Sequence, residues 1–208
     1  MSNAELLDFI DDGGYRQPAL CLSDGWAQVQ AQGWRAPAGW LARAGDGSAG
    51  EGYTQFTQHG EQPLDAAAPV CHLSGCEAAA FAAWAGARLP TEFEWAHAAS
   101  AQAAPGPVRA DGRLCPVAET LPADDAALRQ LHGEVWQWTA SAYAPNPGFR
   151  PLAGPAAEYN DKFMVNQLVL RGSSFATPTG HARHSCRKFF AAAARWQFSG
   201  LRPARDAG

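Results

Sequence analysis

The stretch TGHARHSCRKFF, in the last fifth of the chain, concentrates residue types that do chemistry: histidine, cysteine, arginine, lysine and phenylalanine. His181, His184 and Cys186 match a metal site in type, because imidazole and thiolate both ligate zinc and iron. Histidines three residues apart are presented best by a helix, whereas Pro178 and Gly180 predict a loop here. No fourth ligand lies nearby in sequence, so we expect no metal at these residues.

The four residues that follow favour ligand binding. Arg187 and Lys188 offer positive charge to a carboxylate, arginine as a planar fork and lysine as a point charge. Phe189 and Phe190 offer aromatic faces, which attract a quaternary ammonium through cation–π contact. The pattern therefore suits a small molecule with both groups. The alternative is that the phenylalanines belong to the core and that Arg187 is a structural ion-pair partner.

Composition limits the class of protein. The chain has 208 residues, enough for one domain with a substantial core, and its 21 glycines and 15 prolines predict many turns and long loops. No apolar run is long enough for a membrane helix, and the acidic N-terminus does not resemble a signal peptide. The five cysteines form no CxxC pair, so we expect reduced thiols in a cytoplasmic protein.

Charge is distributed unevenly along the chain. The net charge is only −4, which gives no reason to expect binding to nucleic acid or to a membrane surface. From Arg171 onward, however, there are seven basic residues and one acidic residue. This segment could form an anion-binding face, and a small carboxylate would suit it. The alternative is ordinary surface charge paired with acidic loops elsewhere.

Local signals predict short elements joined by long connections. Capping boxes of the form S/T-x-x-E predict helices that start after Ser2, Ser74 and Thr91, and the third helix should turn Phe93 and Trp95 to the core. Four strand-like runs are APVCHL, EVWQWTAS, LVLRGSSF and FSGLRPA. Residues 26–57 read as irregular. One loop-rich α+β domain over residues 1–208 fits this order best.

Several motifs, taken in order, carry a resemblance to a known family. The segments ARLPTEFEW, GEVWQWT, VLRGSS and FSGLR resemble the formylglycine-generating-enzyme-like (sulfatase-modifying-factor) domain, which has a fold related to C-type lectins. Finer segments, among them YAPNPGFRP, EYNDKFMVNQLVLRGSS and RKFFAAAARWQFSGLR, are similar to the C-terminal half of ergothioneine-biosynthesis sulfoxide synthases. The resemblance implies an activity that uses Fe(II) and O2 to join the sulfur of cysteine or γ-glutamylcysteine to Nα-trimethylhistidine.

The same resemblance implies a missing part. In those synthases three histidines of a preceding helical-bundle domain hold the iron, whereas this chain begins at Met1 on the first helix of the C-terminal domain. We therefore expect the N-terminal iron-binding bundle to be absent, the iron ligands to lie outside this chain, and the chain alone to be inactive. A histidine-bearing helical-bundle domain is the expected partner.

The resemblance also implies roles for named residues. Tyr159 lies where the family has a tyrosine that faces the iron site and can supply a proton or hydrogen atom, a catalytic role. Asn166 and Gln167 have amides that could orient the imidazole of the substrate. The wall formed by residues 187–190 would bind its carboxylate and trimethylammonium. The related synthases usually have asparagine at the position of Lys188.

Two other functions stay open at this point. A formylglycine-generating enzyme needs a pair of copper-binding cysteines in this loop, but Cys186 is the only cysteine after Cys115. A non-catalytic, C-type-lectin-like ligand-binding module remains the main alternative. The family's calcium-binding motif is altered, with Glu134 and Gln137 at the positions concerned. The sequence does not decide between the two thiol donors.

Overall fold

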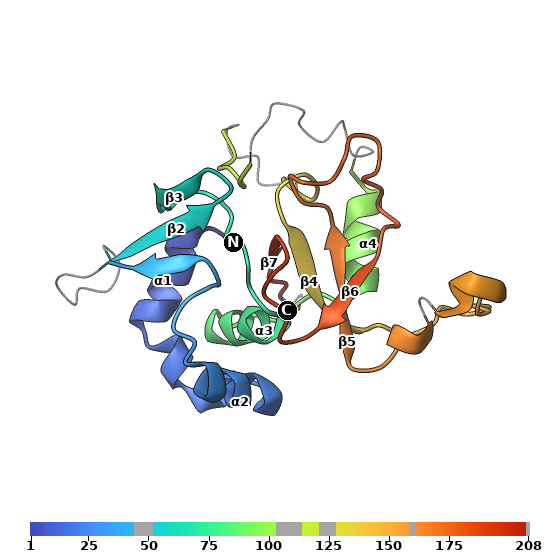
Figure 1. The fold of residues 1–208 in the computed structure, drawn as a ribbon, viewed down its shortest axis with the longest axis horizontal. Coiled ribbons are helices and arrows are strands. Elements are labelled where there is room, and N and C mark those ends of the chain that lie inside the picture. Colours follow the sequence, from blue (N-terminus) through green and yellow to red (C-terminus); the bar gives the residue numbers. More distant parts are fainter. Residues whose placement is uncertain (44–51, 103–113, 121–127, 159–160, 207–208) are drawn as a thin grey trace.

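The computed structural model describes residues 1–43, 52–102, 114–120, 128–158 and 161–206. Two small sheets dominate it, with helices packed around them (Figure 1). The helices are α1 (Asn3–Asp11), α2 (Ser23–Gln32), α3 (Gly75–Trp84) and α4 (Glu92–Ser100), with short 3-10 helices η1 (Gly14–Arg16), η2 (Pro18–Leu20), η3 (Gly154–Glu158) and η4 (Asp161–Phe163). These short elements and long connections confirm the predicted loop-rich α+β fold.

All three predicted capping boxes are present. The hydroxyl of Ser2 accepts a hydrogen bond from the Glu5 amide at the start of α1, and the carboxylate of Glu5 accepts one from the Ser2 amide. The same reciprocal bonds start α3 and α4 after Ser74 and Thr91. Each box satisfies two amides that the helix itself leaves unpaired, which is why such short helices begin where they do.

The expectations about Phe93 and about residues 26–57 were wrong. Phe93 is 68% exposed, because α4 packs through Glu92, Trp95 and Ala99, spaced along one face, and Phe93 lies on the other. Residues 26–57 are not irregular throughout, since they contain most of α2 and two of the strands. The weak amphipathicity of α2 and its internal Gly25 hid the helix, although Gly25 packs directly against Cys76 of α3.

The first sheet is antiparallel, in the order β1 (Trp40–Ala42), β2 (Tyr53–Thr57) and β3 (Gly60–Pro63). The second sheet has the order β6-β5-β4-β7 and contains β4 (Trp136–Ala142), β5 (Gln167–Gly172), β6 (Lys188–Ala191) and β7 (Ser199–Leu201). Strand β7 is parallel to β4, and the other pairs are antiparallel. Of the four predicted strand runs, APVCHL alone forms no strand.

Helices α3 and α4 lie against opposite faces of the second sheet. Successive strand residues point to opposite faces. Trp138 therefore turns toward α3, where its indole donates to the Leu73 carbonyl at 2.8 Å. Gln137 turns toward α4 and accepts a hydrogen bond from the Trp95 indole at 2.8 Å. The sheet is thus covered on both sides, and its edge strand β6 remains accessible.

The buried carboxylate of Glu77 links the N-terminal and C-terminal parts of the chain through hydrogen bonds. Glu77 of α3 is 4% exposed and accepts hydrogen bonds from the Tyr15 hydroxyl at 2.5 Å and from the Arg195 guanidinium at 2.9 Å. It also completes the capping box of Ser74. Burial and the neighbouring Glu77 carboxylate together raise the pKa of Tyr15 well above its usual value. The phenol therefore stays protonated and acts as a donor.

Residues 144–158 and 161–166 form an arm that projects away from the body between β4 and β5, shown in orange in Figure 1. Every residue from 144 to 155 is exposed. Four large apolar side chains of the arm are also open to solvent: Phe149, Leu152, Phe163 and Val165. Among all the described residues, no helix is both long enough and apolar enough to cross a membrane.

Candidate functional site

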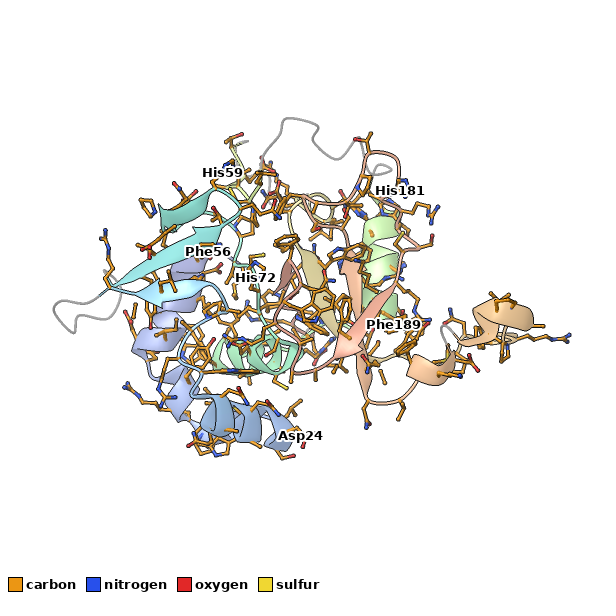
Figure 2. All side chains as sticks on the ribbon, in the orientation of Figure 1. Asp24, Phe56, His59, His72, His181 and Phe189 are labelled. Carbon is orange, nitrogen blue, oxygen red and sulfur yellow. The ribbon has the colours of Figure 1, made fainter. Side chains whose placement is uncertain are left out.

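A cleft of about 740 Å³ opens beside the edge strand β6. Its walls come from the start of β4, from the connection between β5 and β6, and from the segment before β7. The lining residues are Trp136, Ser174, Ala176, Thr177, Pro178, His181, Arg183, Ser185, Cys186, Arg187, Lys188, Trp196, Gln197 and Phe198. Figure 2 labels His181, a lining residue of the cleft, and below it Phe189 of β6. The volume lies within the usual range for small-molecule sites.

The four residues of the RKFF motif do not form one wall. Within β6, Lys188 pairs with Leu170 and Phe190 pairs with Leu168, so both lie on the α3 side of the sheet. Phe189 and the preceding Arg187 lie on the α4 side, since side chains alternate along a strand. The motif therefore splits into two pairs with different surroundings.

Lys188 faces the cleft. Its ammonium lies 4.9 Å from the ring centroid of Trp136, a cation–π contact. No other described residue gives this ammonium a hydrogen bond or an ion pair. Burial lowers the pKa of Lys188 below its usual value, because a half-buried charge loses part of its hydration. The cleft thus contains a positive charge for which the described residues supply no counter-ion.

Arg187 has a partner within the chain. Its guanidinium donates to both carboxylate oxygens of Glu92, at 2.6 and 2.7 Å, and also to the Ala144 carbonyl at 3.2 Å. It lies 5.0 Å from the ring centroid of Tyr143. Glu92 is the first residue of α4, where a negative charge is favoured by the helix dipole. The charge of Arg187 is therefore neutralised at the back of the cleft, and the bidentate pair anchors the start of β6 to α4.

The two phenylalanines contact different aromatic groups. Phe189 stacks on Tyr143, with ring centroids 3.9 Å apart and planes inclined by 9°, and it also contacts Phe163 of the arm at 5.7 Å. Phe190 meets Trp196 edge-on at 4.8 Å and packs against the core. Phe189 therefore links β6 to the base of the arm, whereas Phe190 supports a wall of the cleft.

The other predicted site residues lie toward the arm. Tyr159 falls outside the described residues. Asn166 is exposed, with a positive φ of 54°, immediately before β5. Gln167 begins β5 and pairs with Ala191, three positions along β6 from Lys188, which is about 10 Å at the usual rise per residue. The structure thus brings the two amides near Phe189 and the arm, and separates them from Lys188.

The histidines of the loop do not converge on a metal site. The Nδ1 of His184 lies 3.1 Å from Nε2 of His132. His181 lines the cleft instead. Cys186 donates its S–H to the main-chain carbonyl of His181 at 3.6 Å. The guanidinium of Arg171 donates to the main-chain carbonyl of His184 at 2.8 Å. Within the described ranges, no three histidine, cysteine, aspartate or glutamate side chains gather closely enough to hold a metal.

Sequence reasoning missed Trp136 and Trp196 as lining residues of the cleft, and Glu92 as the partner of Arg187. Trp136 is buried, but its ring also lies beneath the ammonium of Lys188. Glu92 is 95 residues from Arg187 in sequence, so no local pattern joins them. These contacts exist only because α4, β4 and β6 meet in the folded chain.

Comparison with known proteins gives the family. The model of the sulfatase-modifying factor enzyme 1-like domain matches residues 1–106 and 110–207. A hercynine oxygenase of Mycolicibacterium smegmatis is 37% identical over 99% of this chain and 51% of its own length, and that of Mycobacterium tuberculosis is 36% identical with the same shares. The inactive C-alpha-formylglycine-generating enzyme 2 of Mus musculus is 31% identical over 86% of this chain and 56% of its own length.

The chain spans about half the length of the hercynine oxygenases that it matches. The family model, by contrast, covers almost the whole chain. Its motifs also fall on the elements that build the site, since GEVWQWT forms β4 and VLRGSS forms β5 and the turn after it. The chain therefore belongs to the family of sulfatase-modifying factor enzyme 1-like domains.

Proposed function

We propose that this chain is the C-terminal, substrate-pocket-forming domain of a sulfoxide synthase of ergothioneine biosynthesis. The complete enzyme would use Fe(II) and O2 to join the sulfur of cysteine or γ-glutamylcysteine to hercynine (Nα-trimethylhistidine). The observation that carries the proposal is the match to hercynine oxygenases over 99% of this chain. The cleft beside β6 supports it, because it combines an unpaired cation with aromatic walls in a volume suited to an amino acid.

In this proposal the site residues have separate tasks. Lys188 binds the carboxylate of the substrate, since its ammonium is half-buried and has no acidic partner among the described residues. Arg187 fixes the start of β6 through Glu92, which directs Lys188 into the cleft. Phe190, on the cleft side of β6 beside Trp196, would offer aromatic surface to the trimethylammonium group, whereas Phe189 lies on the opposite face of the sheet and holds Tyr143 and the base of the arm.

The arm supplies the remaining groups. Asn166 and Gln167 would orient the imidazole with their amides. Tyr159 is the proposed catalytic residue, and its phenol would hold or transfer a proton at its hydroxyl. Asn166 and Gln167 lie at the base of the arm, whose exposed apolar side chains could be covered by a partner domain.

Iron does not fit the residues described here, because they bring no three suitable ligands together. In the proposed enzyme Fe(II) is held by three histidines of a separate helical-bundle domain, and it supplies the chemistry of O2 activation. The arm and the edge of β6 would face that domain. The pocket would then be completed by two halves, of which this chain contributes the substrate-binding one.

The decisive experiment supplies the missing half. The purified chain is mixed with a histidine-bearing domain from a related synthase, Fe(II), hercynine and each thiol in turn, and sulfoxide is measured by mass spectrometry. We expect product with the domain present and none with the chain alone. Lys188→Gln should raise the KM for hercynine by about tenfold, as expected for the loss of one charged hydrogen bond, with a smaller change in kcat. Turnover by the isolated chain would falsify the two-domain proposal.

A non-catalytic role is the second candidate. The mouse relative is named as inactive, and it shares the same domain at 31% identity. A ligand-binding module would bind hercynine without help from another domain and would form no sulfoxide in the mixture described above. Formylglycine generation has less support, because the lining of the cleft contains a single cysteine, Cys186.

A further inference from the structure

The charges that line the cleft do not balance. Its ionisable residues are His181, Arg183, Arg187 and Lys188, together with the thiol of Cys186, and the lining includes no aspartate or glutamate. Arg187 is neutralised by its bidentate pair with Glu92. Two permanent side-chain charges therefore remain without a counter-ion in the described part of the chain, one at Arg183 and one at Lys188.

The position of Lys188 makes this imbalance costly. Its ammonium is half-buried, stands over the ring of Trp136 at 4.9 Å, and receives no hydrogen-bond acceptor from the described residues. A buried charge is normally paired, because removal from water costs more free energy than an indole face returns. A negatively charged ligand would restore that pairing, and the exposed Arg183 would lie beside it on the same cleft.

The shape of the cleft limits the size of this ligand. At about 740 Å³ it admits a small molecule but no folded partner, and Trp136, Trp196 and Phe198 give it apolar walls. Hydroxyl groups of Ser174, Thr177 or Ser185 could donate to further oxygens. From this arrangement we propose that the cleft is a binding site for a small dianion, either a dicarboxylate or a phosphate monoester, held between Lys188 and Arg183.

The lysine content of the chain permits a direct test. Lys162 and Lys188 are its only lysines, so labelling at each can be read separately. Pyridoxal 5′-phosphate is an aldehyde with a dianionic group; it condenses with an amine to give an imine and water, and borohydride then reduces the imine to a stable secondary amine. At limiting reagent, we expect Lys188 to be labelled more than the exposed Lys162, as measured by peptide mass spectrometry.

Protection identifies the ligand class. Succinate and inorganic phosphate are added separately, with acetate and chloride at the same ionic strength as controls. We expect at least one dianion to protect Lys188 and to leave Lys162 unaffected. Protection by succinate alone indicates a dicarboxylate, and protection by phosphate alone indicates a phosphate ester. Equal protection by acetate or chloride would overturn the proposal, because it would show only screening.

Two substitutions complete the test. Arg183→Gln should weaken protection of Lys188 roughly tenfold, the loss expected when one charged contact is removed. Arg150→Gln, which removes an exposed charge on the arm, should leave protection unchanged. A thermal-shift titration with succinate and phosphate provides a second readout that does not need an accessible amine. If neither dianion protects Lys188 or raises the Tm, the cleft is not an anion site.

This inference stands on the cleft alone and not on synthase activity, and a dianion bound at Lys188 would compete with the hercynine carboxylate for that residue. A chain that binds dianions but gives no sulfoxide with the histidine-bearing domain would retain the anion site and lose the proposed function. A chain that supports sulfoxide formation but shows no selective protection of Lys188 would keep the proposed function and lose the anion site. The two experiments therefore fail independently.

Discussion

At the scale of single residues, neighbours in sequence have different surroundings in the fold. Arg187 is neutralised by Glu92, whereas Lys188, one position later, lacks an acidic partner among the described residues. The sequence identified both as candidate anion-binding groups, because residue type and spacing are visible in it. The sequence could not show that Arg187 is paired and Lys188 is not, since this difference depends on the face of the strand and on a partner 95 residues away. The candidate residues were thus predictable from the sequence, but the side of the sheet on which each lies and the partner of each were not.

His132 and His184 form a partly buried pair with a consequence for stability. The pKa of His132 is lowered to about 4, chiefly by burial and further by the nearby His184 and Arg171. The ordinary value of 6.5 applies to the unfolded chain, so below about pH 6.5 the unfolded state binds the proton more readily than the folded state. The stability contributed by neutral His132 is therefore present at pH 7 and is lost as the pH falls toward 4.

We expect this group to account for a loss of about 1–2 kcal/mol between pH 7 and pH 4.5, after allowance for solvent screening of the half-exposed site. Urea unfolding of the wild type and of His132→Gln at both pH values measures it. The variant should show a flatter pH dependence. His59→Gln, which changes an exposed loop histidine, should retain the wild-type slope. Equal slopes for the wild type and the His132 variant would show that the pair does not couple to folding.

At the scale of elements, signals that act within a few residues were reliable. The three capping boxes located α1, α3 and α4 because each is a local contact between residues three apart. The strands β4, β5 and β7 followed from β-branched, aromatic and apolar runs. Strands β1, β2, β3 and β6 were missed, since each has only three to five residues and is stabilised by pairing with a neighbouring strand.

The capping boxes should differ in their effect on stability. Ser74 is fully buried, and its box uses the same Glu77 that holds Tyr15 and Arg195. Ser74→Ala should therefore lower the free energy of unfolding by about 2 kcal/mol, at the upper end for an N-cap. The matched change Ser2→Ala removes a more exposed cap and should cost about 0.5–1 kcal/mol. Urea denaturation gives both values, and a larger loss at Ser2 would contradict the role given to Glu77.

At the scale of the whole molecule, the arm is the part that lacks packing of its own. Its exposed Leu152 and Val165 are 61% and 62% exposed. If the arm docks on the histidine-bearing domain, Leu152→Glu and Val165→Glu should weaken that complex, because each places a charge in an apolar contact. Neither should change the Tm of the isolated chain. Calorimetric titration measures the affinity.

The matched control is Leu22→Glu, which introduces the same charge at an exposed leucine, 58% exposed, before α2 and away from the arm. The affinity of the Leu22→Glu variant for the histidine-bearing domain should equal that of the wild type. An arm variant with unchanged affinity would place the interface elsewhere on the molecule. The family resemblance implies a partner domain, but the sequence does not predict this surface, because the exposure of the apolar groups depends on how far the arm projects.

The same arm makes the chain divisible. It joins β4 to β5, and both neighbours of β4 in the sheet, β5 and β7, follow it in the chain. A cut within the exposed residues 144–155 breaks no strand and leaves both fragments bound through the full length of the β4 pairings. The chain could therefore be split between β4 and β5. The two fragments, expressed separately, would have to pair through β4 to rebuild the second sheet, so their association could be measured directly.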